Sequence, residues 1–237
     1  MHPIDRLRAV ARAGWAPPDV LATEAAWALA DLALHEPQAL LPSCRRLLER
    51  HPGCGPLWWV SARVLSAGDP TDEALRCGDE LDDDRTAELL LEAVPAGARL
   101  VRRGGVGDVA GAEIVVVEAE ALGPGGMVVD SDVRGLLQAA RDLEVPVWVQ
   151  TGVGRILPTR IWEALARRLG DSTRPDQGHG VTVRHWGRAS SDRIVRAGVP
   201  ETLEGVARVA GPRGVLPLAA ALTTADCPEP GELLAPW

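Results

Sequence analysis

The sequence predicts an α/β protein in which a helical N-terminal domain precedes a Rossmann-like, mostly parallel sheet. Two observations lead to this prediction. Apolar residues recur at helical spacing through most of the first 95 residues. Beyond them, short apolar runs typical of buried strands alternate with helical patterns, as they do when helices join parallel strands. We therefore expect two domains, a helical one over 1–95 and an α/β one over 96–237.

Residues 113–150 carry the strongest part of this prediction. Ile114–Val117 is a β-branched run with acidic residues on both sides, the pattern of a strand buried on both faces. The glycine-rich loop 123–126 ends that pattern, and Asp130 begins a set of N-capping residues before a helix that reaches Leu143. A second buried strand follows over 145–149. Strand, crossover helix and strand form a βαβ unit, and such sheets usually bind ligands at the carboxyl ends of their strands.

The other elements follow from periodicity and from turn residues. In the first 95 residues we expect helices over 20–34 and 36–50, through Trp58 and Trp59, from Asp69–Thr71, and over 86–94. In the rest we expect a strand at Leu100 and Val101, a loop at Gly104, Gly105 and Gly107, a helix after Pro158, an exposed linker over 172–180, an edge strand over 181–183, a last helix over 200–209, a strand or docking segment over 215–222, and an irregular tail after Cys227.

Trp58 and Trp59 are neighbours on a predicted helix. Adjacent residues on a helix point in different directions, so we expect only one of the two rings to face inward. The other would sit at an interface, for which the contact between the helical segment and the sheet is the best candidate.

Composition excludes several classes of protein. A chain of 237 residues can bury a large core, and its net charge of -8 with a pI near 5.2 argues against nucleic-acid binding, because no basic field would displace counterions from phosphates. No apolar run approaches the roughly 20 residues of a membrane span, and the charged segment 1–12 does not resemble a signal peptide. We therefore expect a cytoplasmic protein with no membrane partner.

Four residue types are missing. The chain has no Lys, Asn, Phe or Tyr, so all 25 cationic side chains are Arg and eight Trp supply the aromatic mass. The codons of these four amino acids are A/T-rich, so their absence indicates a very G+C-rich genome. We expect a bacterial source. The four cysteines lack metal-type spacing, and we interpret them as free thiols.

Several residues of 113–150 match the core segment of a known family. Val115–Val117 lead into Glu118, Ala119 and Glu120 where that family has a hydrophobic strand ending in Gly-Ala-Asp. Gly125 and Gly126 match its Ala-Asn-Gly-Gly loop, and Val145 and Pro146 match a strand that begins Val-Pro. The segment resembles the translation initiation factor 2B family (α, β and δ subunits), which includes the methylthioribose phosphate and ribose bisphosphate isomerases. A weaker resemblance covers HPGCGPLWWVSARVL after Arg50.

The resemblance implies a fold of the NagB/RpiA/CoA-transferase type with an N-terminal helical domain. It also implies a homodimer formed through the α/β domains and a small phosphorylated ligand. A role in nucleotide exchange during translation is not implied for a bacterial protein.

The departures from the family decide the functional prediction. No Thr-His-Cys-Asn motif, which supplies the isomerases' cysteine, occurs in the chain. The positions of the family's phosphate-holding Asn-Lys pair fall on Val129 and Asp130, so a carboxylate that repels phosphate replaces an ammonium. We therefore expect a catalytically degenerate protein that serves as a binding, assembly or regulatory module. The alternative is an active sugar-phosphate isomerase with a rearranged site, in which Glu120 is the acid or base and Arg155 holds the phosphate.

The candidate site residues each have a simpler interpretation. Glu120, the candidate catalytic residue, could instead cap a helix or form a salt bridge. Gly152, Gly154 and Arg155 belong to a loop whose amides could hold an anion, or they form a tight turn with a surface arginine. Gly125, Gly126 and Asp130 complete the candidate ligand-binding set.

Three further expectations concern cofactors and metals. Asp130 and Asp132 are more often helix caps than metal ligands, so we predict no metal, and no motif calls for a cofactor. His179, His185 and Trp186, near Arg184 and Arg188, could bind a ligand or partner, although a lone histidine is usually structural. Cys77 lies among acidic residues, which would raise its pKa and oppose a nucleophilic role.

Overall fold

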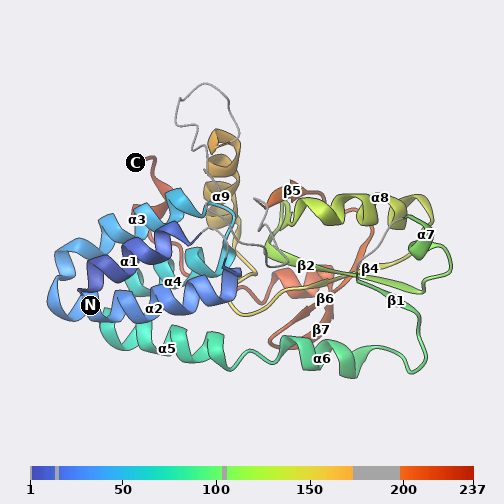
Figure 1. Cartoon of the computed structure of the whole chain (residues 1–237), viewed down its shortest axis with the longest axis horizontal. Helices are drawn as coiled ribbons and strands as arrows, with labels where there is room; N and C mark the ends of the chain where they lie inside the picture. The colour runs from blue at the N-terminus through green and yellow to red at the C-terminus, as the bar shows by residue number, and fades with distance from the viewer. Residues whose placement is uncertain (1, 14–15, 103–105, 173–197) are drawn as a thin grey trace, which may run out of the picture.

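A computed structural model describes residues 2–13, 16–102, 106–172 and 198–237 of the chain. Five helices of the N-terminal part gather at one end of the molecule and the sheet lies at the other (Figure 1). The structure confirms four of the helices predicted there, α2 (Pro18–His35), α3 (Leu40–Arg50), α4 (Gly55–Ser66) and α5 (Pro70–Asp82). It adds two elements that were not predicted, α1 (Pro3–Arg12) and a 3-10 turn η1 (Pro37–Ala39).

Local signals start α5 and the next helix, α6 (Thr86–Ala93). Asp69 is the N-cap of α5: its carboxylate accepts hydrogen bonds from the amides of Thr71 and Asp72, at 3.0 and 3.1 Å, and Pro70 occupies the first helical position. Asp84, which lies one residue before the N-cap position of α6, accepts a hydrogen bond from the first amide of that helix, the amide of Thr86, at 2.9 Å. These caps are why the predicted helix starts agree with the structure.

Within the described ranges, seven strands form one mixed sheet in the order β5-β3-β2-β4-β6-β7, with β1 paired in parallel to β2. The strands β2, β4 and β6 are parallel, whereas β3, β5 and β7 are antiparallel to their neighbours. The α/β class with a helical N-terminal part is thus confirmed, but the sheet is mixed. The strands are β1 (Leu100–Val101), β2 (Ile114–Gly123), β3 (Gly126–Val129), β4 (Val147–Gln150), β5 (Val199–Glu201), β6 (Val206–Gly211) and β7 (Gly214–Pro217).

The βαβ unit is present, with a hairpin inserted into it. β2 and β4 pair in parallel, with Val115 opposite Val147, and α8 (Arg134–Asp142) connects them after a 3-10 turn η2 (Ser131–Val133). The glycine-rich segment 123–126, expected as a loop, is instead the turn between β2 and antiparallel β3. The reason is burial: every residue from Ala121 to Gly123 is buried, so the strand continues beyond the β-branched run.

Helices cover both faces of the sheet (Figure 1). Apolar residues of α8, α10 (Leu218–Leu222) and the short α7 (Val106–Val109) pack on one face in a shared cluster. α6 packs on the other face, where Leu90 meets Ile114, Val116 and Trp148. α9 (Thr159–Ser172) stands between the sheet and the N-terminal helices, and its buried residues join the core of those helices. None of the helices in the described ranges is long and apolar enough to cross a bilayer.

Some predicted elements near the C-terminus are wrong. The helix expected over 200–209 is replaced by β5 and β6, because Gly205 turns the chain with a φ of 80° and the following valines pair with β4. The segment 215–222 divides into β7 and α10, and the tail contains a short helix, α11 (Gly231–Leu234). Gly107 lies in α7 instead of a loop. Gly104, Gly105, the linker beyond Ser172, the edge strand 181–183 and the cluster around His179, His185 and Trp186 lie outside the described residues.

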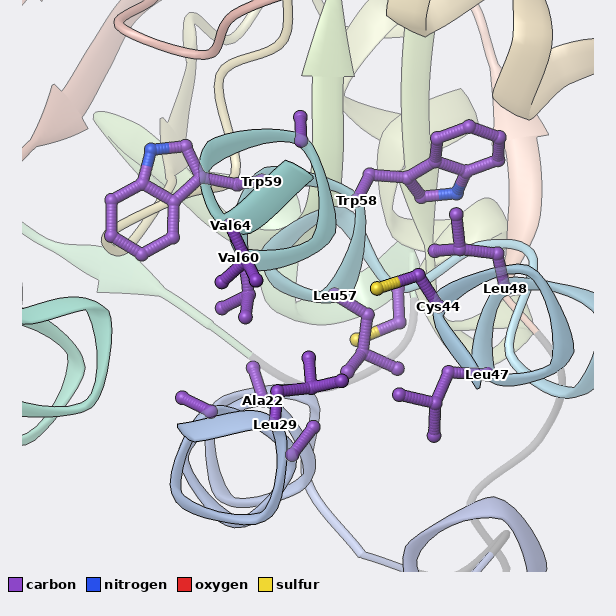
Figure 2. Packing of buried hydrophobic residues seen from close by; sticks show 14 of the residues in the cluster. Ala22, Leu29, Cys44, Leu47, Leu48, Leu57, Trp58, Trp59, Val60 and Val64 are labelled. Carbon is purple, nitrogen blue, oxygen red and sulfur yellow. The ribbon is translucent and has the colours of Figure 1, made fainter. Parts of the chain in front are cut away.

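The expectation that only one of Trp58 and Trp59 faces inward is wrong, since both are wholly buried. Figure 2 shows the two rings leaving α4 on different sides. α4 packs against α2, α3 and α5, and against β2, so every side of the helix faces protein. The indole of Trp59 donates to Asp226 Oδ1 at 2.9 Å, and the guanidinium of Arg63 lies 4.5 Å from its ring centroid.

We predict that Trp59→Ala lowers the free energy of unfolding by about 3–5 kcal/mol, because it empties a wholly buried site that its neighbours cannot refill. Denaturant unfolding followed by circular dichroism measures this. The control is Leu34→Ala on α2, where the side chain is 67% exposed and the change should stay within about 0.5 kcal/mol. Equal effects of the two substitutions would contradict the central role of α4.

Candidate functional site

A cleft of about 540 Å³ lies beside the N-terminal helices, at the point where the parallel pairing of β2 with β4 ends, at Glu118 and Gln150. α2, the end of α5 and the start of α6 form one side of it, and Glu118, Gln150 and the loop after β4 form the other. Its charged lining residues are Asp19, Glu24, Asp82, Asp84, Glu118 and Arg155. The position agrees with the general rule that ligands bind beyond the carboxyl ends of parallel strands.

Arg155 is a buried cation in this cleft. Only 6% of the residue is exposed, which excludes the predicted surface arginine. Its Nη1 donates to Glu118 Oε1 at 2.7 Å and to the carbonyl oxygen of Ala119 at 3.0 Å. Nε is buried without a hydrogen-bond partner among the residues that the structure describes. The guanidinium is therefore committed to a carboxylate of the chain itself.

The carboxylate of Asp84 bonds to a backbone amide of the loop that carries Arg155. Its Oδ2 accepts a hydrogen bond from the amide of Val153 at 2.9 Å, while Oδ1 accepts from Thr86. A Cβ atom on Gly152 would collide with Asp84 Oδ2, so only glycine permits this approach. The anion that the sequence predicts at loop 151–155 is thus a side chain of the protein. Sequence reasoning missed this contact because Asp84 precedes Val153 by 69 positions, and no local pattern links the two residues.

Known structures share the fold of the chain, although no protein-family model and no curated protein matches the sequence. The β subunit of initiation factor eIF2B from Chaetomium thermophilum superposes with a TM-score of 0.68 at 13% identity, covering 98% of this chain and 91% of that one. The tetrameric eIF2B-β2-δ2 complex of C. thermophilum gives 0.63 at 13%, with 93% of each chain covered. The 5-methylthioribose 1-phosphate isomerase of Pyrococcus horikoshii OT3 gives 0.53 at 11%, covering 93% and 87%.

The chain has the eIF2B-like fold. This is the fold that the resemblance of residues 113–150 implies, and these superpositions confirm it over almost the whole chain.

Glu120 stands behind the cleft of the eIF2B-like fold, at an irregularity in the pairing of β2 with β3. Its carboxylate reaches toward Gly53 and Gly198, where a Cβ on Gly198 would lie 2.6 Å from Oε2. No described residue donates a hydrogen bond to it. Burial raises the pKa of Glu120 to about 7, the charge of Arg155 opposes this rise, and Asp130 and Glu118 add to it. Glu120 is therefore a carboxyl group that titrates near neutrality.

The predicted glycines fall into separate places. Gly152 lines the cleft. Gly154 has a φ of 71° and lies against the ring of Trp59, so it serves the shape of the loop. Gly125 and Gly126 form the hairpin turn and pack closely on Trp162, away from the cleft lining. The structure thus brings Gly152 and Arg155 together and leaves the hairpin glycines elsewhere.

Asp130 is a helix cap in the structure. Its Oδ1 accepts from the amide of Asp132 at 3.0 Å at the start of η2, and Val129 before it is buried in β3. Within the described ranges, no group of three or more His, Cys, Asp and Glu side chains could hold a metal ion.

All four cysteines are buried and free, as predicted. Cys54 lies at the start of α4. Burial raises its pKa to about 12, and the negative charge of Glu120 adds to this rise. Burial is also the main reason why the pKa of Cys77 rises to about 12, with Glu73 and Glu80 adding to the effect. Thiols of this kind are almost wholly protonated at neutral pH, so neither replaces the missing nucleophile.

Glu120 should make stability depend on pH. Its folded pKa of about 7 exceeds the ordinary glutamate value of 4.5, so the stabilisation from the protonated form is complete below about 4.5 and is lost as pH rises through 7. The side chain of Glu120→Gln stays neutral at every pH. Between pH 4.5 and 8, the free energy of unfolding of this variant should therefore rise relative to that of the wild type by on the order of 1–3 kcal/mol. Denaturant unfolding at several pH values measures this difference.

The control for this experiment is Glu49→Gln, which removes an exposed carboxylate of α3. The free energy of unfolding of this control should differ from that of the wild type by the same amount at every pH in this range. A flat difference for Glu120→Gln as well would mean that Glu120 is ionised throughout.

Proposed function

We propose that the chain is a catalytically degenerate, eIF2B-like binding or assembly module whose phosphate site is occupied by its own carboxylates. One observation carries the proposal: Asp84 accepts the amide of Val153, and Glu118 pairs with Arg155. These are the donors on which the sequence prediction of an anion site rests. Both are already used within the folded chain.

The surrounding charge supports the same conclusion. At an effective dielectric constant near 20, one carboxylate about 4 Å from a phosphate charge repels it by roughly 4 kcal/mol, or about a thousandfold in affinity. The cleft lining holds five carboxylates and one guanidinium. A sugar phosphate would have to displace Asp84 or Glu118 and then remain beside the carboxylate that it displaced.

The alternative remains an active sugar-phosphate isomerase with a rearranged site. Two features favour it: Glu120 has a pKa near 7, which suits a general acid or base, and the charge of Arg155 acts on its carboxylate. Glu118 has a side chain that is 60% exposed, so it could swing away and release Arg155 to a phosphate. In that case Glu120 would move the proton and Arg155 would hold the anion.

For the assembly role we propose a homodimer formed through the α/β part of the chain, with the division between 1–95 and 96–237 retained. The support is the fold shared with subunits of a tetrameric eIF2B-β2-δ2 complex. A module without chemistry of its own would act through such protein contacts.

We predict that ribose and methylthioribose phosphates, and inorganic phosphate, neither raise the melting temperature of the wild type nor are turned over. Glu118→Gln should bind inorganic phosphate more tightly than the wild type by about tenfold, because it frees Arg155 and removes one repulsive charge. Isothermal titration calorimetry measures both proteins, with Glu49→Gln as the matched loss of one charge. Turnover of either sugar phosphate by the wild type would establish the isomerase alternative.

Sedimentation equilibrium tests the assembly. A homodimer should give about twice the chain mass of 25.1 kDa at micromolar concentration. A mass of one chain at all concentrations up to about 100 µM would remove the dimer from the proposal.

A further inference from the structure

The carboxyl group of Glu120 lies where three segments of the chain meet. A Cβ atom on Gly198, just before β5, would lie 2.6 Å from Oε2 and 2.5 Å from Val128 Cγ1 of β3. A Cβ atom on Gly53, just before α4, would lie 3.7 Å from the same oxygen and 3.2 Å from the same methyl group. No hydrogen bond to the carboxyl oxygens forms within the described ranges. A carboxylate in this position loses water without gaining a donor, so the neutral acid is the form that fits.

The charged groups around Glu120 do not remove this preference. Among the described residues, Arg155 of the loop after β4 favours the ionised form, whereas Asp130 and Glu118 oppose it. Arg155 is already paired with Glu118 at 2.7 Å. Cys54, at the start of α4, is protonated at neutral pH because burial raises its pKa to about 12. Burial therefore prevails and raises the pKa of Glu120 to about 7.

β5 is the most weakly held of the three segments. It is a three-residue strand at one edge of the sheet, and its Pro200 has no amide with which to pair (Figure 1). Its one charged residue, Glu201, pairs with Arg134 of α8 at 2.6 Å and with Arg141 at 3.9 Å. The side chain of Arg134 is 54% exposed, and ion pairs open to solvent contribute at most about 1 kcal/mol. β3, between β5 and β2, has no charged residue.

The wall on the other side of Glu120 is held firmly. A Cβ atom on Gly55 would lie 2.6 Å from the carbonyl oxygen of Glu120, so the start of α4 is pressed against β2. The same helix carries the wholly buried Trp58 and Trp59. Moving this wall would open the core, whereas moving β5 breaks only a short ladder at the edge of the sheet. Local opening in proteins follows the segment with the fewest buried contacts.

We propose that Glu120 is a proton-operated latch on the edge strand β5. While the carboxyl group is protonated, β5 lies across it and pairs with β3. When the group is ionised, release of β5 lets water reach the carboxylate and leaves the outer edge of β3 unpaired. An unpaired strand edge can pair with another extended segment, so the latch controls when the sheet has a free edge on this side.

The direction of the pH effect follows from the two states of β5. With β5 in place the pKa of Glu120 is about 7, and with β5 released it returns toward the ordinary value of 4.5. Below 4.5 the acid is protonated in both states, so the closed state keeps its full advantage. Between pH 6 and pH 8 that advantage is lost, and the ratio of released to closed β5 should rise about tenfold.

The test is amide hydrogen exchange of the whole protein at pH 6 and pH 8, followed by mass spectrometry and corrected for the intrinsic pH dependence of exchange. In the wild type, the opening equilibrium of the β3 and β5 amides should rise about tenfold between the two pH values. In Glu120→Gln, whose side chain stays neutral, it should not change. β7, the strand at the far end of the sheet order, should show no rise in the wild type.

The control variant is Glu49→Gln, which removes an exposed carboxylate of α3 and should keep the tenfold rise of the wild type. If Glu120→Gln does not fold, the comparison of β5 with β7 within the wild type decides alone. An unchanged opening of β5 in the wild type would overturn the proposal. An equal rise in β7 would also overturn it, because the whole sheet would then be opening. So would a rise confined to the start of α4, which would place the release on the other side of Glu120.

Discussion

The structure depends on the burial of α4. Because helices surround it on three sides and β2 lies on the fourth, both of its tryptophans are enclosed. Trp59 contacts Arg63 on one side and Gly154 on the other, and it hydrogen-bonds to Asp226. One side chain thereby joins the N-terminal helices to the loop after β4 and to the C-terminal segment. The walls of the cleft are positioned by this contact, since Gly152 and Arg155 belong to that loop.

Within those walls, the charges are arranged against the chemistry that the fold suggests. The eIF2B-like fold is shared with an isomerase of a sugar phosphate, an anion. Here the loop amide and the guanidinium that suit an anion are taken by Asp84 and Glu118. Of the other acids of the cleft, Glu24 is paired with Arg6, whereas Asp19 and Asp82 have no ion-pair partner among the described residues. Fold and electrostatics therefore point in different directions.

Local sequence signals predicted much of the fold. The β-branched run of β2 and the caps at Asp69 and Asp84 depend on neighbouring residues, so the elements they begin could be read directly. β5 and β6 could not, because what makes 200–209 extended is pairing with strands distant in sequence. The candidate site divides in the same way. Gly152 and Arg155 were found from a loop pattern, whereas the contact of Asp84 with Val153 joins residues 69 positions apart.

That contact makes Asp84 a tethered competitor. A free anion must compete with a carboxylate whose effective concentration at the amide of Val153 is in the millimolar range or above. In a relative that closes on a ligand, the closed state would be populated according to the ligand's concentration. Here the tie between the start of α6 and the loop after β4 is intramolecular, so closure of that side of the cleft becomes independent of any metabolite.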